Sequence, residues 1–196
     1  MALEYRVVHL ATLLGGIALL FTGVGSYPGS PKVFPHDALG ISSIVVLSGY
    51  GVYLLAIRGV RLFDGLRKPV SDQKREAIAI FRNYTLGSPV PPEVRQRIAR
   101  HNVPSSYASI LLTISFVQLM ISGVFLILLA PGSSLYGVMQ QIHNYGVGLT
   151  ALFVFLHLAA VSNVANRPLL RAVFTNGKVP LVWVKEHWGN LSRTEI

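Results

Sequence analysis

Residues 141–161, QIHNYGVGLTALFVFLHLAAV, are the stretch that decides the fold. The stretch contains no Lys, Arg, Asp or Glu. It has the length of a helix that spans a lipid bilayer, about 20 residues. Its two histidines, His143 and His157, are 14 residues apart. On an α-helix this spacing is about 40° short of four turns and about 21 Å along the axis, so both rings project from nearly one face. Ionisable side chains at such depth are costly and usually functional, so the stretch predicts a functional membrane helix.

The chain contains four such apolar runs among its 196 residues. The runs are residues 7–24, 38–57, 107–130 and 145–164. Charged residues make up 13% of the chain, against about 25% in an average soluble domain, and the runs lack the polar faces of surface helices. We therefore predict an all-α membrane protein, a single domain that forms a four-helix transmembrane bundle. The predicted transmembrane helices are about 7–27, 36–57, 105–130 and 138–165.

The basic residues predict the orientation of this bundle. The net charge is +9, and all but one of the 17 Lys and Arg residues precede the first run, separate the second from the third, or follow the fourth. With four crossings these segments fall on one side, which the positive-inside rule makes cytoplasmic. Both termini, the loop 58–104 and the tail 166–196 are therefore expected on the cytoplasmic side of a prokaryotic plasma (inner) membrane. A cytoplasmic membrane face accounts for the basic surface, and no nucleic-acid partner is expected.

The segments outside the runs contain smaller features. The loop and the tail predict short helices at 72–84, 92–101 and 168–175. Trp183 and Trp188 are candidate anchors in the lipid interface. The chain contains no cysteine, which excludes disulfides, Fe–S clusters and thiolate zinc sites within it. Any metal must therefore be bound by His, Met or oxygen ligands.

The depth of four histidines predicts two metal sites. His36 begins the second run at the outer side, level with His143, and His9 lies in the first turn of the first run at the inner side, level with His157. Two pairs of imidazoles stacked across a membrane are what two six-coordinate haems require. A copper or zinc site would need all imidazoles at one point, which the spacing of about 21 Å disfavours. We predict two haem b groups whose irons have these four histidines as axial ligands.

Small residues accompany these histidines. Gly16 and Gly23 share a helix face with the first of them, and Gly40 follows the second by four residues. Missing side chains leave room for a flat macrocycle, although small residues also simply let helices pack closely. The other two histidines, His101 and His187, lie outside the apolar runs and are expected to be ordinary polar residues.

With these residues identified, the chain resembles the cytochrome b (gamma) subunits of respiratory formate dehydrogenases. It resembles more distantly those of membrane-bound nickel–iron hydrogenases and thiosulfate reductases. The resemblance covers most of the chain, and the histidine spacing on the last run is its most specific part. The closing stretch points to the formate dehydrogenase branch. The matching pieces are Arg6-Val-Val-His9, Phe21-Thr22-Gly23, His36 with Gly40, Ile142-His143, Leu156-His157-Leu158 and the closing stretch 175–187.

The resemblance implies a role in electron transport within a respiratory chain. In that family the histidines that match His36 and His143 hold the outer haem, and those that match His9 and His157 hold the inner haem. The chain would then be a subunit of an oxidoreductase complex, with an Fe–S electron-transfer subunit and a catalytic subunit on the extracytoplasmic side. Electrons would pass between that Fe–S subunit and a quinone, menaquinone or ubiquinone, at the cytoplasmic side.

The resemblance also indicates where the quinone binds. The family's pocket lies beside the inner haem, where an Asn-containing segment enters the third helix. The corresponding candidates here are Asn102, Ser105 and Ser106, with Asn163 as a further polar candidate. The family usually has a Gly and a Gln-Lys pair after this Asn, whereas this chain has Pro104 and no Lys there.

Two functions without redox chemistry remain open from the sequence. One is a membrane anchor without cofactor, in which the histidines are incidental. The other is a small transporter subunit, which is expected to have polar or broken helices at the middle of the membrane. An absorption spectrum of the dithionite-reduced protein separates both from a cytochrome.

Overall fold

The computed structural model of the chain describes residues 3–24, 30, 33–53, 56, 64–98 and 102–187, without the side chains of 5, 64, 165 and 185–187. All regular elements in these residues are helical. Contacts divide the chain into two compact units. The hairpin unit comprises Ala2–Val60 and Thr113–Ala151, and the basic unit comprises Arg61–Leu112 and Leu152–Ile196. His101, Trp188 and the side chain of His187, which the sequence analysis singled out, lie outside the described residues.

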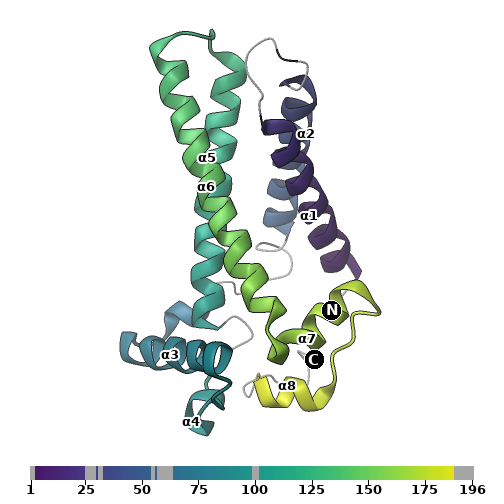
Figure 1. Ribbon diagram of the computed structural model, residues 1–196, viewed down its shortest axis with the longest axis vertical. Coiled ribbons are helices and arrows are strands. Elements are labelled where there is room, and N and C mark those ends of the chain that lie inside the picture. Colours follow the sequence, from purple (N-terminus) through teal and green to yellow (C-terminus); the bar gives the residue numbers. More distant parts are fainter. Residues whose placement is uncertain are drawn as a thin grey trace. The chain divides into compact units, whose positions relative to one another are not determined.

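The hairpin unit is built from two helical hairpins (Figure 1). In the first, α1 (Leu3–Gly23) packs against α2 (Val33–Val52). The second joins α5 (Val103–Leu128) to α6 (Ser134–Ser162) by a short turn, in which Gly132 has a φ of 88° that other residues rarely adopt. A Cβ at Gly146 of α6 would lie 2.9 Å from Cγ of Leu119 on α5, so the two helices approach closely there.

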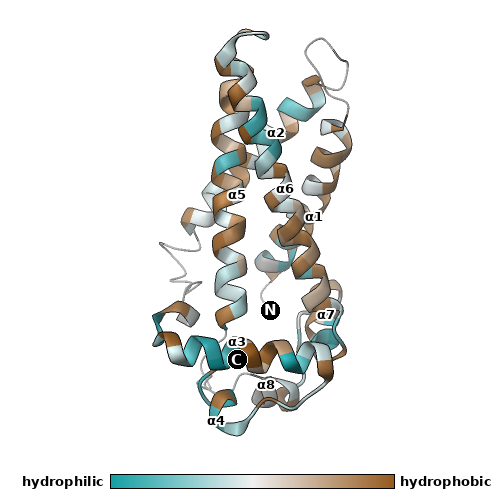
Figure 2. Ribbon diagram, turned by 60° about the vertical axis from the view of Figure 1, so that its left-hand side comes forward, coloured by the Kyte–Doolittle hydropathy of each residue, from teal (hydrophilic) through white to brown (hydrophobic). Residues whose placement is uncertain are grey.

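Among the residues that the structure describes, three helices are long and apolar enough to cross a membrane. These candidate spans are Arg6–Gly23 within α1, Val103–Leu128 and Ser134–Ser162. Hydrophobic residues predominate along them (Figure 2), and large apolar side chains such as Phe21, which is 77% exposed, face outward. Such exposure is expected where lipid is the solvent. The structure therefore confirms an all-helical chain with membrane spans.

The second predicted span, 36–57, is not among these candidates. Its helix, α2, has 20 residues and contains the polar pair His36 and Asp37 near its start, while residues 54–55 and 57 lie outside the described part. Those residues include the apolar Leu54, Leu55 and Ile57 that lengthened the run in the sequence. A fourth crossing, and with it the side of each terminus, stays a prediction.

The other three helices begin two or four residues before their predicted first residues, 7, 105 and 138. Helix α1 begins at Leu3, α5 at Val103 and α6 at Ser134. They also end earlier than predicted, at Gly23, Leu128 and Ser162. Hydropathy reports where apolar side chains lie, whereas a helix continues through flanking polar residues until its backbone hydrogen bonds stop.

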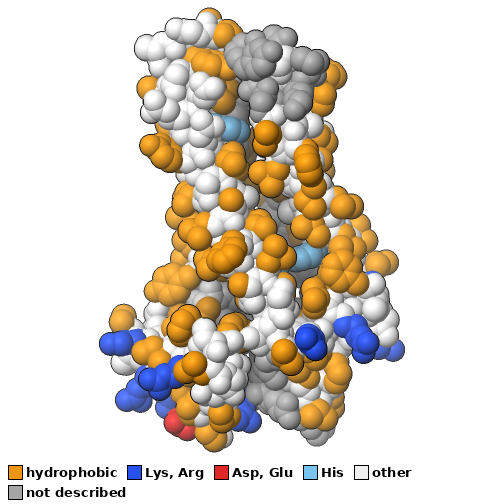
Figure 3. Space-filling model, in the orientation of Figure 1, with side chains coloured by type: hydrophobic (Ala, Val, Ile, Leu, Met, Phe, Trp, Pro, Cys, Tyr) orange, Lys and Arg blue, Asp and Glu red, His pale blue; other side chains and the backbone are white. Residues whose placement is uncertain are grey.

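The basic unit contains the short helices and much of the charge. Lys and Arg side chains gather on its helices, as Figure 3 shows. The predicted helix 72–84 is present as α3 (Val70–Leu86), which ends at Gly87 with a φ of 64°. The predicted helix 168–175 is α7 (Arg167–Phe174). The remaining elements are η2 (Asp64–Arg67), α4 (Pro92–Arg95), η3 (Val164–Asn166) and α8 (Leu181–His187).

Two expectations for this unit were wrong. The helix predicted at 92–101 is a single turn, α4, because the chain turns at Gln96 and Arg97 instead of continuing. Trp183 is only 8% exposed. Its indole packs inside the unit, so it does not serve as the interfacial anchor that its type suggested.

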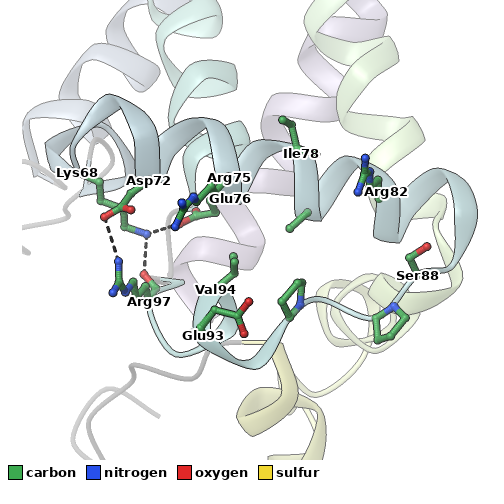
Figure 4. A pocket seen from close by; sticks show the side chains of 13 residues that line it. Lys68, Asp72, Arg75, Glu76, Ile78, Arg82, Ser88, Glu93, Val94 and Arg97 are labelled. Carbon is green, nitrogen blue, oxygen red and sulfur yellow. Dashed lines mark hydrogen bonds and ion pairs between the residues drawn. The ribbon is translucent and has the colours of Figure 1, made fainter.

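A buried carboxylate joins α3 to the start of α5. Glu76 is 2% exposed, forms an ion pair with Lys68, and accepts a hydrogen bond from the backbone N–H of Val103 at 2.8 Å. Lys68 also donates to the carbonyl oxygen of Arg97 at 2.6 Å, as Figure 4 shows. The carboxylate thereby satisfies one of the unpaired N–H groups that begin every helix. This ion pair fixes where α5 begins.

Candidate functional site

His36 and His143 face each other in the hairpin unit. His36 lies in the first turn of α2 and His143 in the first half of α6, and both rings are half-buried. Their ring centres are 6.3 Å apart and the ring planes are 79° apart. The pair predicted for the outer side is therefore brought together.

The distance between these rings fits two ligands of one metal ion. A metal–imidazole bond is about 2 Å long and the ring centre lies about 1 Å behind the nitrogen, so imidazoles on opposite sides of a metal have centres about 6 Å apart. The observed 6.3 Å matches this value. A steep angle between the planes is compatible with axial ligation, because each ring can rotate about its own metal–nitrogen bond.

Each ring also contacts a hydroxyl group on a neighbouring helix. His36 Nδ1 lies 3.2 Å from Oγ1 of Thr22, and His143 Nδ1 lies 3.0 Å from Oγ of Ser122. Metal-ligating histidines normally use their second ring nitrogen in such a hydrogen bond. The contacts involve Nδ1 in both rings, so Nε2 is the nitrogen of each ring with which it would hold a metal.

Sequence reasoning missed the roles of these hydroxyl residues. Thr22 was noted only as part of a matching piece, and Ser122 was not noted. A signal was present, because each is followed by glycine and each lies on the helix before a histidine's helix: Thr22-Gly23 before His36, and Ser122-Gly123 before His143. The pattern predicts a contact with the histidines only once the helices are known to pair as hairpins.

The predicted inner histidines belong to different units. His9 is an exposed residue of α1 in the hairpin unit, and His157 is a half-buried residue of α6 in the basic unit. The ring of His157 stacks on Phe153, with centres 5.6 Å apart and planes 16° apart. Their pairing stays a prediction.

The glycines near the histidines take different places. A Cβ at Gly23 would lie 3.0 Å from Cε1 of His36. This glycine, which the sequence places on the same helix face as His9, therefore lies against the ring of His36. A Cβ at Gly16 or Gly40 would meet nothing within 4 Å. Open space at these two positions is compatible with the room that a flat macrocycle needs.

The predicted quinone residues form the first turn of α5 in the basic unit. Asn102 Oδ1 accepts a hydrogen bond from the backbone N–H of Ser105 at 2.9 Å, and Ser105 Oγ donates to the carbonyl oxygen of Asn102 at 2.9 Å. Ser106 is 0% exposed. Asn102 is thus the N-cap of the helix. Within the described residues, the hydrogen bonds of this turn use Oδ1 and the carbonyl oxygen of Asn102 and not its Nδ2.

Close packing supports this turn. A Cβ at Gly65 would lie 2.8 Å from backbone atoms of Asn102 and Val103 and from the hydroxyl of Ser106. Asn163, the further polar candidate, donates to the carbonyl oxygen of Tyr84 at 2.9 Å. Asn163 therefore ties the end of α6 to α3.

No cluster of three or more His, Asp or Glu side chains is present in the part of the chain that the structure describes. The ligand geometry found in this part is the facing pair of imidazoles. Two imidazoles and a planar macrocycle complete the six ligands of a haem iron.

One comparison decides the family. The family model described as prokaryotic cytochrome b561 matches residues 2–176. The chain belongs to this family. No curated protein and no solved structure gives a significant match.

Prokaryotic cytochromes b561 are membrane proteins that bind haem b and transfer electrons. The match includes His9, His36, His143 and His157. It ends near the beginning of the stretch 175–187, on which the resemblance to the formate dehydrogenase branch depended. The comparison therefore supports a membrane cytochrome b and does not single out a formate dehydrogenase or hydrogenase subunit.

The residues in this cytochrome fit the cofactor of the family. His36 and His143 have the separation of two axial ligands, and a hydroxyl group contacts the Nδ1 atom of each. Neutral imidazole is a normal axial ligand of haem iron.

Proposed function

We propose that this cytochrome b561 is a di-haem electron-transfer subunit of a respiratory oxidoreductase complex in a prokaryotic plasma membrane. The observation that carries the proposal is the facing pair His36 and His143, with ring centres 6.3 Å apart. The pair comes from two different hairpins and has the spacing of two ligands on one iron. Such an arrangement is not needed by a membrane anchor or a transporter.

The proposal assigns four ligands to two haems. His36 and His143 would hold the outer haem, and His9 and His157 the inner haem. Each bound haem supplies a one-electron couple; the chain supplies the ligands, their orientation and an apolar surrounding. The depth of the residues on their helices supports the inner pair, since His143 and His157 are separated by about 21 Å along α6.

The charge distribution supports the orientation. Four spans with both termini in the cytoplasm place all but one of the 17 Lys and Arg residues on the cytoplasmic side. The helices of the basic unit would then lie at the cytoplasmic surface. The outer haem would face the extracytoplasmic space, where an Fe–S subunit joined to a catalytic subunit would exchange electrons with it.

The inner haem would exchange electrons with menaquinone or ubiquinone at the cytoplasmic side. Reduction of one quinone takes two electrons and two protons and gives one quinol; the reverse reaction oxidises quinol. Asn102 is the favoured polar contact, because its Nδ2 can donate to a quinone carbonyl oxygen while its Oδ1 caps α5. The resemblance of the closing stretch supports a complex of the formate dehydrogenase type.

A spectrum with a haem count tests this function. We expect the purified, dithionite-reduced protein to show sharp low-spin b-type bands and two haems per chain. His36→Ala and His143→Ala should each lose the same single haem, because each removes one of its two ligands. His157→Ala should lose the other haem. The midpoint potential of the haem that remains in each variant then shows which potential belongs to which site.

The opposite results are also clear. A protein without a Soret band would support an anchor or a transporter and overturn the proposal. One haem per chain, lost equally from all three variants, would overturn the assignment of two pairs. His101→Ala is a suitable control, since this histidine lies outside the apolar runs and should leave both haems bound.

A further inference from the structure

His36 and His143 have the same kind of polar neighbour. Thr22, which contacts Nδ1 of His36, lies on α1, and Ser122, which contacts Nδ1 of His143, lies on α5. In each case the hydroxyl residue belongs to the first helix of a hairpin and the histidine to the second. The two contacts are therefore equivalent parts of the two hairpins.

The hydroxyl protons determine the direction of both contacts. Thr22 Oγ1 donates to the carbonyl oxygen of Ala18 at 2.8 Å, and Ser122 Oγ donates to that of Gln118 at 2.6 Å. A hydroxyl has one proton to donate and two lone pairs with which to accept. Because the proton is already used, each contact fits the Nδ1–H of the ring as donor and the hydroxyl oxygen as acceptor. His143 also has a backbone hydrogen bond with Leu119. A neutral imidazole in this tautomer has its lone pair on Nε2, the nitrogen available to iron.

A glycine follows each hydroxyl residue and faces the same ring. A Cβ at Gly23 would lie 3.0 Å from Cε1 of His36, and a Cβ at Gly123 would lie 3.6 Å from Cε1 of His143. Bare backbone therefore lies against the edge of each ring between its two nitrogens. We call each pair, Thr22-Gly23 and Ser122-Gly123, an imidazole cradle.

We propose that the two imidazole cradles position His36 and His143 as ligands of one haem iron by fixing the tautomer and the rotation of each ring. The proposal rests on the di-haem function above and adds a role for residues that do not touch iron. A hydrogen bond from the second ring nitrogen orients a ligating histidine and makes it a stronger electron donor. A stronger donor favours ferric iron, so the cradles lower the reduction potential of this haem.

The test uses the full-length protein purified with its haems. The variants are Thr22→Ala and Ser122→Ala, made singly and together. The readouts are the midpoint potential of each haem, its low-spin electron paramagnetic resonance signal, and the haem content. The parental protein and His36→Ala identify which potential belongs to the outer haem.

Matched controls separate positioning from packing. Ser115→Ala removes another serine of α5 that, like Ser122, is 0% exposed. Thr12→Ala removes a threonine of α1 whose hydroxyl, like that of Thr22, donates to the carbonyl oxygen four residues earlier. The hydroxyl oxygens that contact Nδ1 of His36 and His143 belong to Thr22 and Ser122 and not to the control residues.

We expect each cradle variant to raise the potential of the outer haem and to shift its resonance signal. A tenfold change in the ferric-to-ferrous equilibrium is about 59 mV for one electron; we expect a shift of up to this size. The inner haem and both control variants should keep the parental values. Thr22→Ser and Ser122→Thr retain a hydroxyl, so the outer haem of these variants should keep the parental potential and resonance signal. An Ala variant that loses the outer haem also supports the proposal, provided that the variant with a retained hydroxyl and the matched control variant both keep this haem.

Unchanged potentials and resonance signals in both Ala variants would overturn the cradle proposal and leave the di-haem function standing. Equal shifts in the control variants would overturn it too, because they would reveal a general effect of lost packing. A parental protein that binds no haem would instead overturn the di-haem function itself.

Discussion

The hairpin unit and the basic unit use their polar side chains in different ways. In the hairpin unit, hydroxyl groups such as those of Thr12, Ser42 and Thr150 donate to a carbonyl oxygen one turn earlier on their own helix. Hydroxyl groups of the basic unit form such bonds too, for example that of Thr85. Other polar groups of this unit join segments far apart in the sequence, as Asn163 does when it donates to the carbonyl oxygen of Tyr84. The first pattern satisfies a polar group inside one helix, and the second builds a fold.

The physical reason is the solvent around each segment. A hydroxyl in lipid has no water to bond with, and the backbone of its own helix is the nearest acceptor. Polar contacts between helices are then exceptions. Three contacts of this kind in the hairpin unit lie around the histidine pair: Thr22 and Ser122 contact the histidines, and Gln118 donates at 2.7 Å to the carbonyl oxygen of Ile142, the residue before His143. In a membrane chain, such contacts between helices indicate a site.

The largest effect on stability is expected from breaking the buried ion pair of the basic unit. Glu76→Ala leaves Lys68 without its partner and the N–H of Val103 without its acceptor. Loss of one member of a buried pair costs about 3–5 kcal/mol. Denaturant unfolding in detergent, followed by circular dichroism, measures this change.

The exposed carboxylate of Glu93 provides the control for this variant. Glu93 lies on α4 and lines the same hollow beside α3 (Figure 4). Glu93→Ala should leave stability nearly unchanged. Equal stability of Glu76→Ala and Glu93→Ala would contradict the assigned role of the buried pair. The outer haem should keep its potential in both, since neither residue belongs to the hairpin unit.

A smaller effect is expected where α5 and α6 meet. In Gly146→Ala the new Cβ would lie 2.9 Å from Cγ of Leu119, so that side chain must move. Overpacking typically costs about 1–3 kcal/mol, partly offset by the better helix propensity of Ala. We expect a net destabilisation of about 1 kcal/mol by the same unfolding measurement.

A second glycine of α6 provides a control, because its replacement should change stability in the opposite direction. A Cβ at Gly148 would meet nothing within 4 Å. Gly148→Ala should therefore stabilise the helix by about 0.5–1 kcal/mol. If both variants change stability in the same direction, the close approach of α5 and α6 at Gly146 is wrong.

The smallest effect is expected from the exposed ion pair between Arg97 and Asp72. The two groups are 3.2 Å apart, and the Arg97 side chain is 66% exposed. Surface pairs of this kind contribute roughly 0–1 kcal/mol, so Asp72→Asn should destabilise the basic unit by less than Glu76→Ala. The loss should shrink further in about 1 M salt, where the Debye length is about 3 Å. A loss as large as that of Glu76→Ala at both salt concentrations would contradict this ranking.

Much of the fold could be predicted because spanning helices are coded locally. Apolar runs predicted the helices α1, α5 and α6 to within a few residues at their first residues. The basic loop predicted α3, but not that the next helix would stop after one turn at Arg95. Helix ends depend on backbone hydrogen bonds with distant partners, such as the bond from Val103 to Glu76, and hydropathy does not report these.

The facing histidines of the candidate site could be predicted from the sequence, and the residues that contact them could not. Histidines are rare at membrane depth, so His36 and His143 stood out from the sequence. The supporting residues Thr22 and Ser122 are ordinary helix residues until a ring lies 3 Å away. The quinone candidates show the converse, since Asn102, Ser105 and Ser106 were chosen by resemblance and the structure gives them the hydrogen bonds and burial of a helix start.

The sequence by itself determined that this chain is a helical membrane protein, and it predicted which side chains would hold haem. It did so because the cost of burying charge in lipid leaves a pattern that needs no partner residue to be read. Only the tertiary structure decided that the rings of His36 and His143 face each other and that a hydroxyl and a glycine hold each of them. Those facts depend on how one helix is rotated against the next, which is set by side-chain packing between helices and not by the hydropathy of either one.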